Sequence, residues 1–265
     1  MIRNNIEKII VISLLDLKLK YQGSFFGLLW SFMKPLLMFI VYFSIFGLIL
    51  KLNTGFEYAL SLFLGVLVWN YFAEATSLGL NSFIGKAGII TKLYVNKLIF
   101  PISALLTSFY SFLVNLTIFF IIYFTTHIIL NKTIPRINVM DLSFFFLGIL
   151  LISLLILGLN IMLACLNTFF RDFQQIWELV LTYGVFLTPI IFPLPIPEKY
   201  KTLYYYINPL AFALEAIKSP FFDKYKIREI YSISIWIKEF FICVFLIIFS
   251  LIVYNFLKKK IVNYL

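Results

Sequence analysis

Charged residues are scarce in this chain: Asp, Glu, Lys and Arg make up 13% of its 265 residues, against roughly a quarter in ordinary soluble proteins. Apolar residues make up 62% and aromatic residues 20%. A water-soluble domain of this length cannot bury that much apolar surface in its core. The scarcity of charge therefore excludes an ordinary soluble protein and predicts an integral membrane protein.

Residues that commonly carry enzyme chemistry are also few. Because His127 is the single histidine, neither a metal-binding cluster nor a serine-histidine-acid triad is expected. The two cysteines, Cys165 and Cys243, lie inside apolar runs and are expected to be buried apolar side chains rather than disulfide partners. The one Gly-Lys pair, Gly85-Lys86, lacks the upstream glycine of a phosphate-binding loop. The chain by itself is therefore not expected to hydrolyse ATP, and no cofactor or metal is predicted.

The charge that is present is mostly positive, with 22 Lys and Arg against 12 Asp and Glu and a net charge of +10. A nucleic-acid-binding protein gathers such charge on one face or arm. Here the basic residues lie between apolar runs, as they do in loops that orient a membrane protein. Membrane lipid is therefore an expected partner, and nucleic acid is not.

Six apolar segments are long enough to cross a membrane, because the hydrocarbon core is about 30 Å thick and a helix rises about 1.5 Å per residue. They are residues 25–50, 58–80, 98–130, 142–170, 176–192 and 240–257. In the first segment, Pro35 is expected in the first turn of the spanning helix, where its missing N–H costs little. The predicted fold class is an all-α integral membrane protein with six transmembrane helices, which form one domain over residues 31–257.

The basic residues also predict the orientation of the chain. An even number of crossings places both termini on one side, and short cytoplasmic segments are enriched in Lys and Arg. The two short loops on the opposite side hold only Lys51, Lys132 and Arg136, while the short segments on the side of the termini hold a larger share. Both termini are therefore expected in the cytoplasm, with residues 258–265 as a cytoplasmic tail.

The outer segment before the last span, about residues 193–229, is apolar and aromatic but is broken at Asn208-Pro209 and Ser219-Pro220. Two short helices at the outer interface, or dipping into the membrane and returning, fit this pattern better than a seventh span. We expect such a hairpin to form an outer gate with these candidate residues: Pro189, Pro193, Asn208 and Pro209. The alternative is an extracellular amphipathic loop with no role in gating.

Charges within the spans are few, which argues against a transporter driven by protons or sodium, because such proteins place carboxylates or broken helices near the membrane midplane. Aromatic rings are abundant instead. In the first span, four of them fall within roughly 60° on a helical wheel, with a fifth at the border: Phe32, Phe39, Phe43, Phe46 and the bordering Tyr42. Aromatic faces hold sugar rings and lipid chains without charge, so these residues are candidates for a substrate path. The alternative is that they face lipid or another helix.

The segment LKLKYQGSFFGLLWSFMKPLL (17–37) resembles the R-Y-x-x-S-x-L-G-x-L-W-x-x-x-x-P-L motif in permeases of the type-2 ABC exporters that move O-antigen, capsule and teichoic acid polymers. Lys20 replaces the usual arginine. Three later segments are similar to the family's turn between spans four and five, the end of its span five and its N-P-L motif: NTFFRD (167–172), TPIIFP (188–193) and INPL (207–210). Thr188 and Phe192 depart mildly from the family's Ser and Tyr. The resemblance covers nearly the whole chain in order.

The resemblance implies a half-channel of six helices that pairs with a second copy, while each copy carries a separate cytoplasmic ATPase that binds ATP. It implies an amphipathic interface helix at about residues 6–30, within an N-terminal region of residues 1–30, and a path lined by spans one and five. The loop after span two and the turn before span five would dock on the ATPase through these candidates: Lys86, Lys92, Lys97, Arg171 and Asp172. The cargo implied is a lipid-linked polysaccharide, with O-antigen favoured, which is moved across the inner membrane.

Other functions stay open at this point. The same short architecture also serves drug and antibiotic efflux. A membrane enzyme that modifies polymers would require clustered acidic or histidine residues in loops, and the sequence lacks them. A gated ion channel would require a charged or carbonyl-rich filter, for which there is no signature.

Overall fold

The structure is a computed structural model, and it describes residues 2–24, 27, 29–51, 55–93, 95–130, 138–191, 196–223 and 232–265. Within these ranges the chain forms helices and turns and no strands. The helices are α1 (Ile2–Tyr21), α2 (Leu29–Tyr42), the π-helix η1 (Phe43–Ile49), α3 (Phe56–Leu80), the 3-10 helix η2 (Ile84–Lys86), α4 (Ala87–Lys92), α5 (Ile99–Ile129), α6 (Val139–Phe169), α7 (Phe173–Leu187), α8 (Glu198–Ile207), α9 (Pro209–Lys218) and α10 (Ile233–Tyr264).

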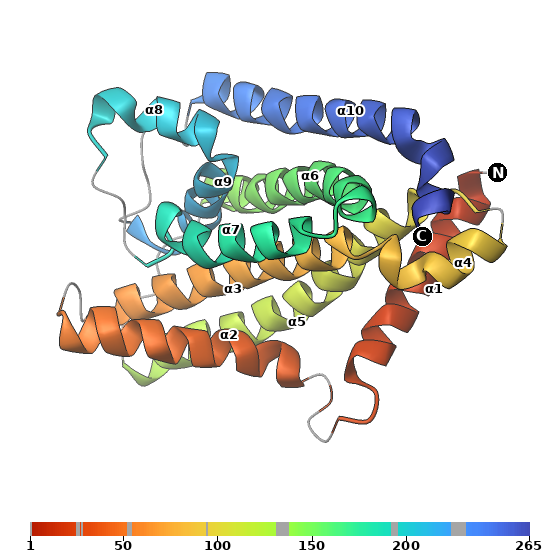
Figure 1. The fold of residues 1–265 in the computed structure, drawn as a ribbon. Helices are drawn as coiled ribbons and strands as arrows, with labels where there is room; N and C mark the ends of the chain where they lie inside the picture. Colours follow the sequence, from red (N-terminus) through yellow and green to blue (C-terminus); the bar gives the residue numbers. More distant parts are fainter. Residues whose placement is uncertain are drawn as a thin grey trace.

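Five helical segments are long and apolar enough to cross a membrane: Leu29–Ile49, Phe56–Leu80, Ile99–Ile129, Val139–Phe169 and Ile233–Tyr264. They confirm the predicted all-α membrane class. Figure 1 shows them side by side as one bundle, with both chain termini at one end and the α8–α9 hairpin at the other. The bundle thus has a termini end and a hairpin end.

The predicted fifth span, residues 176–192, is not confirmed as a full crossing. Its helix α7 has 15 residues and ends at Leu187, so it is about 22 Å long against a hydrocarbon core of about 30 Å. The helix stops early because a residue before proline is pushed out of the helical region. Thr188 precedes Pro189 and is extended, at φ −114 and ψ 142. Phe192 and Pro193 lie outside the described residues.

Helix α3 occupies the centre of the bundle. Of its most apolar stretch 78% is buried, against 11% for α2 with η1 and 17% for α10. Its neighbours approach closely because α3 carries glycine at the contact points, as is common between membrane helices. At Gly79, for example, an added Cβ would lie 2.2 Å from the side chain of Asn160 on α6. The central position of α3 lets it contribute side chains to cavities on several sides.

The interface helix that the resemblance implied at about residues 6–30 ends earlier than expected. Helix α1 ends at Tyr21, and the chain turns through Gly23 and Gly27, whose φ angles are 76 and 49. Such left-handed angles suit glycine, which has no Cβ to clash. In Figure 1, α1 lies across the termini end of the bundle, and α2 begins a new direction.

The prediction that Pro35 lies in the first helical turn is wrong. Helix α2 begins at Leu29, so Pro35 is its seventh residue. A proline there has no N–H to donate to the carbonyl four residues earlier, which belongs to Ser31. Asn115 of α5 supplies the missing donor, because its Nδ2 lies 3.2 Å from the Ser31 carbonyl oxygen. The proline is therefore tolerated inside the helix through a contact with a neighbouring helix.

Candidate substrate cleft

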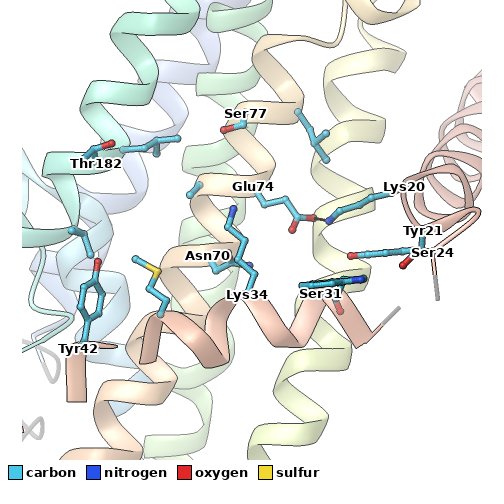
Figure 2. A pocket seen from close by; sticks show the side chains of 16 residues that line it. Lys20, Tyr21, Ser24, Ser31, Lys34, Tyr42, Asn70, Glu74, Ser77 and Thr182 are labelled. Atoms are coloured by element: carbon cyan, nitrogen blue, oxygen red, sulfur yellow. Dashed lines mark ion pairs between the residues drawn. The ribbon is translucent and has the colours of Figure 1, made fainter. Parts of the chain in front are cut away.

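A cleft of ≈ 740 Å³ opens between α1, α2, α3 and α7 (Figure 2). Its volume lies within the range of about 300–1,000 Å³ that is usual for ligand pockets. The lining combines rings, hydroxyl and amide groups, apolar side chains and three charges: Lys20, Tyr21, Ser24, Trp30, Ser31, Lys34, Met38, Tyr42, Asn70, Ala73, Glu74, Ser77, Leu78, Leu181, Thr182 and Val185.

One wall of the cleft is a row of side chains on α2. Trp30, Lys34, Met38 and Tyr42 follow one another at intervals of four residues, and residues at this interval lie on one face of a helix. The row places an indole ring, an ammonium group, a thioether and a phenol along a single line. The cleft can therefore contact a long amphipathic molecule at several points.

The opposite wall, α7, is fixed to α3 by two tryptophans. The indole N–H of Trp177 donates to the hydroxyl of Thr76 at 3.0 Å. Gly184 lies against the ring of Trp69, which an added Cβ would approach to 2.9 Å. These contacts hold the short helix α7 against α3. The cleft thus has one wall, α7, that is anchored on the central helix.

An ion pair closes the cleft on the side of α1. The ammonium of Lys20 lies 2.7 Å from the carboxylate of Glu74 on α3, and both side chains are mostly shielded from solvent. Burial acts to lower the pKa of Lys20, but the charge of Glu74 and its hydrogen bond outweigh burial and raise the pKa. Lys20 therefore stays protonated beside the cleft, and the pair ties α1 to α3.

The predicted aromatic stripe divides between two environments. Tyr42 lines the cleft. Phe32 and Phe39 pack against Phe63 of α3, with ring centroids 5.9 and 5.0 Å apart, and Phe43 lies 6.4 Å from Tyr58. Phe46 is also partly buried, and its ring lies 6.4 Å from that of Tyr42. A role for the four phenylalanines in a path formed with a second copy stays a prediction.

Three of the four candidate gate residues, Pro189, Asn208 and Pro209, lie where the α8–α9 hairpin meets the end of α7; Pro193 lies outside the described residues. The last carbonyl groups of a helix have no partner within it, and here the hairpin supplies donors. The carbonyl of Leu187 accepts hydrogen bonds from the hydroxyl of Tyr204 at 2.8 Å and from Nδ2 of Asn208 at 3.1 Å. Asn208 also caps α9, where its Oδ1 accepts from the N–H of Ala211, and Pro209 is the first residue of that helix.

A fully buried lysine completes this junction. The ammonium of Lys218, at the end of α9, lies 3.1 Å from the carbonyl oxygen of Pro189 and 3.2 Å from that of Ile190. Gly65 of α3 leaves room for it, since an added Cβ would lie 2.9 Å from Nζ. Glu215, one turn earlier, accepts a hydrogen bond from the hydroxyl of Tyr205. The junction therefore joins α7 to the hairpin and packs against α3. Of its polar side chains, sequence reasoning predicted Asn208 but not Tyr204, Glu215 or Lys218.

The candidate docking residues gather at the termini end, where two of them contact other helices and three are exposed. Lys86 pairs with Asp16 of α1, and Lys97 donates to the carbonyl of Lys258 at 2.7 Å. These two lysines tie the loop between α3 and α5 to α1 and α10. The others are exposed there and face outward from the bundle: Lys92, Arg171 and Asp172.

Sequence reasoning did not predict Lys20, Lys34 or Glu74, the charged residues of the cleft, as site residues. Lys34 is the single charged residue of α2. An ionisable side chain within a span is by default a candidate functional group. Its spacing from Trp30 and Tyr42 was a signal that a second stripe, next to the phenylalanine stripe, faces a polar cleft.

A bundle of membrane-length helices with a cleft between α1, α2, α3 and α7, lined by rings, hydroxyl and amide groups, apolar side chains and charges, fits a membrane transport protein. Comparison with known proteins agrees. The family model described as ABC-2 type transporter matches residues 7–222. The chain belongs to this family.

Three individual relatives carry the name of an export permease. The chain is 31% identical over 210 residues to an O-antigen export system permease protein RfbA from Klebsiella pneumoniae, which covers 77% of this chain and 76% of the relative. A second protein of that name from Klebsiella pneumoniae is 28% identical over 259 residues, covering 96% and 93%. One from Myxococcus xanthus is 27% identical over 216 residues, covering 78% and 77%.

Proposed function

We propose that the chain is the membrane-spanning half of an ATP-driven exporter that moves a lipid-linked polysaccharide, with O-antigen the favoured cargo, across the cytoplasmic membrane. The names of the three relatives support this cargo. The observation that carries the proposal is the cleft between α1, α2, α3 and α7, because rings, hydrogen-bonding groups and charged groups line one cavity of ≈ 740 Å³. Such a surface suits sugars joined to a lipid.

The energy source in this proposal is a separate cytoplasmic ATPase that binds ATP, since the chain has no phosphate-binding loop. The exposed Lys92, Arg171 and Asp172 are its proposed contacts. Closure of the ATPases would move these segments, and the anchored helix α7 would pass the motion to the cleft.

A second copy of the chain completes the passage, so the proposed assembly has two permeases and two ATPases. The outward faces of α2 and α7 carry exposed apolar side chains such as Leu37 and Tyr183. An exposed apolar face of this kind is suited to lipid or to another subunit. One bundle alone leaves the cleft open on that side.

We further propose that α7 and the turn after it also cross the membrane, as the fifth span in chain order, which brings the number of crossings to six. The termini end then lies in the cytoplasm, and the α8–α9 hairpin lies outside as a gate over the cleft. The helical break at Asn208 and Pro209 supports the hairpin. The distribution of Lys and Arg supports the orientation.

A deletion strain tests the proposed cargo. Loss of the gene should remove polysaccharide from the cell surface and leave lipid-linked polymer inside the cell, and the intact gene should restore export. A strain that keeps its surface polysaccharide and loses only resistance to a drug would contradict the proposal and favour the efflux alternative.

A further inference from the structure

The cleft carries a positive charge that the chain itself does not neutralise. Its lining contains two ammonium groups, Lys20 and Lys34, and one carboxylate, Glu74. Glu74 pairs with Lys20. No ion pair of Lys34 is found among the described residues, and Lys34 lies inside an otherwise uncharged, apolar helix. Lys34 is exposed and lines the cleft, so its ammonium is accessible to a ligand, and a negatively charged ligand is its natural complement.

The two lysines point at one strip of α3. Figure 2 shows Lys20 reaching Glu74 from the side of α1, while Lys34 extends from α2 along α3, past Asn70 and toward the level of Glu74. An anion on this strip would meet Lys34 directly and could draw Lys20 away from Glu74. Charge-assisted hydrogen bonds to oxyanions are roughly twice as strong as neutral ones.

The rest of the lining indicates what the anion is attached to. Trp30 and Tyr42 flank Lys34 on its own helix, one turn before and two turns after it, and Thr182 of α7 also lines the cleft (Figure 2). Rings next to hydroxyl and amide groups suit sugar faces and sugar hydroxyls. Apolar side chains such as Met38 suit a lipid chain.

We propose that this cleft binds the phosphate group that joins the sugar to its lipid carrier, with Lys34 as the primary contact and Lys20 as a second one that exchanges Glu74 for the phosphate. This inference rests on the proposed function and deepens it, because it names the group of the cargo that is recognised. Glu74 then acts as an internal competitor that holds the site closed until a phosphate arrives.

The test uses the purified full chain in nanodiscs of phosphatidylcholine and measures the binding of a polyprenyl diphosphate. A polyprenol of the same chain length, phosphatidylglycerol and inorganic diphosphate serve as comparison ligands. The polyprenyl diphosphate should bind about tenfold more tightly than the polyprenol, because one charge-assisted contact is worth about that factor. Equal binding of these two ligands overturns the proposal. Equal binding of phosphatidylglycerol also overturns it, since the cleft would then read any lipid phosphate.

Four variants separate a binding role from a structural one. Lys34→Ala should weaken the polyprenyl diphosphate about tenfold, and Lys34→Arg should retain most of the affinity. Lys18→Ala removes an exposed charge two residues before Lys20 and should change nothing. Glu74→Gln removes the competing carboxylate and should tighten binding several-fold, a gain that a purely structural role of Glu74 would not produce. If Lys34→Ala binds like Lys18→Ala, or Glu74→Gln does not tighten binding, the proposal is wrong.

The same variants in the deletion strain keep this inference apart from the proposed function. A chain that restores surface polysaccharide but shows no preference for the diphosphate overturns the inference and leaves the exporter function standing. A chain that binds the diphosphate but does not restore the polysaccharide contradicts the exporter function instead.

Discussion

Replacing Lys218 by Met should loosen the junction between α7 and the α8–α9 hairpin. The side chain is fully buried, and its ammonium donates to two carbonyl groups just beyond the end of α7. Methionine fills nearly the same space but donates no hydrogen bond. The carbonyls of Pro189 and Ile190 would then lose the donor that the hairpin provides.

The magnitude follows from these two contacts. Below pH 7, where Lys218 is protonated, each hydrogen bond from its ammonium contributes about 1.5–3 kcal/mol, so losing two costs about 3–6 kcal/mol. Methionine offsets part of this cost because it avoids burying a charge. We expect a net loss of about 3 kcal/mol in the free energy of unfolding, and at roughly 2–4 °C per kcal/mol the midpoint should fall by roughly 6–12 °C.

The assay is thermal unfolding of the purified chain in detergent, with Lys199→Met on α8 as the matched control. Lys199 is exposed, so its replacement should shift the midpoint by no more than about 1–2 °C. Gly65→Ala perturbs the junction from α3, where the new Cβ would meet the ammonium of Lys218 at 2.9 Å. The double variant should lose less than the sum of the two single variants. If Lys218→Met unfolds at the same temperature as Lys199→Met, the junction does not depend on this lysine.

Three further outcomes follow from the contacts between helices. Asn115→Leu should lower the free energy of unfolding by about 1–3 kcal/mol in the same assay, because the Ser31 carbonyl loses its donor; an unchanged midpoint would contradict this. Gly184→Val should displace α7 from Trp69, because an added Cβ alone would lie 2.9 Å from the ring. The free energy of unfolding should fall by about 1–3 kcal/mol. A variant as stable as the wild-type chain would mean that this contact does not hold α7 in place. Burial lowers the pKa of Lys218 from 10.5 to about 7, against the opposing charge of a neighbouring carboxylate. Between these two pH values the unfolded chain binds more protons than the folded chain, so the contribution of Lys218 to the free energy of unfolding should rise from pH 7 to pH 9. The rise in the free energy of unfolding should be smaller in Lys218→Met than in the wild-type chain. An equal rise in the two proteins would refute this prediction.

The helices themselves were predictable because hydrocarbon imposes length and apolar composition on each crossing. The predicted spans 58–80, 98–130 and 142–170 agree with α3, α5 and α6 to within about three residues at each end. The end of α7 was not predicted, because the apolar run continues beyond Thr188 while the following proline stops the helix. Apolar composition therefore predicts that a segment can lie in the membrane, whereas the position of proline determines where its helix ends.

The candidate site was less predictable, because it depends on which face of each helix meets a neighbour. The wheel of α2 correctly grouped Phe39 and Phe43, but it could not tell that their partners lie on α3. Likewise, Pro35 was placed in the first turn by a local rule, whereas a donor from α5 makes an interior position tolerable. Lys218 and Gly65 are far apart in the sequence, and only the packing of α9 on α3 brings them together.

Transport in a defined membrane tests the central claim most directly. The chain and its ATPase partner would be reconstituted into liposomes, lipid-linked polysaccharide supplied on the side of the ATPase, and its arrival on the other side followed with a membrane-impermeant lectin. We predict arrival that requires ATP, the ATPase and the chain together. Arrival without ATP or without the ATPase, or no arrival with all three present, would contradict the account.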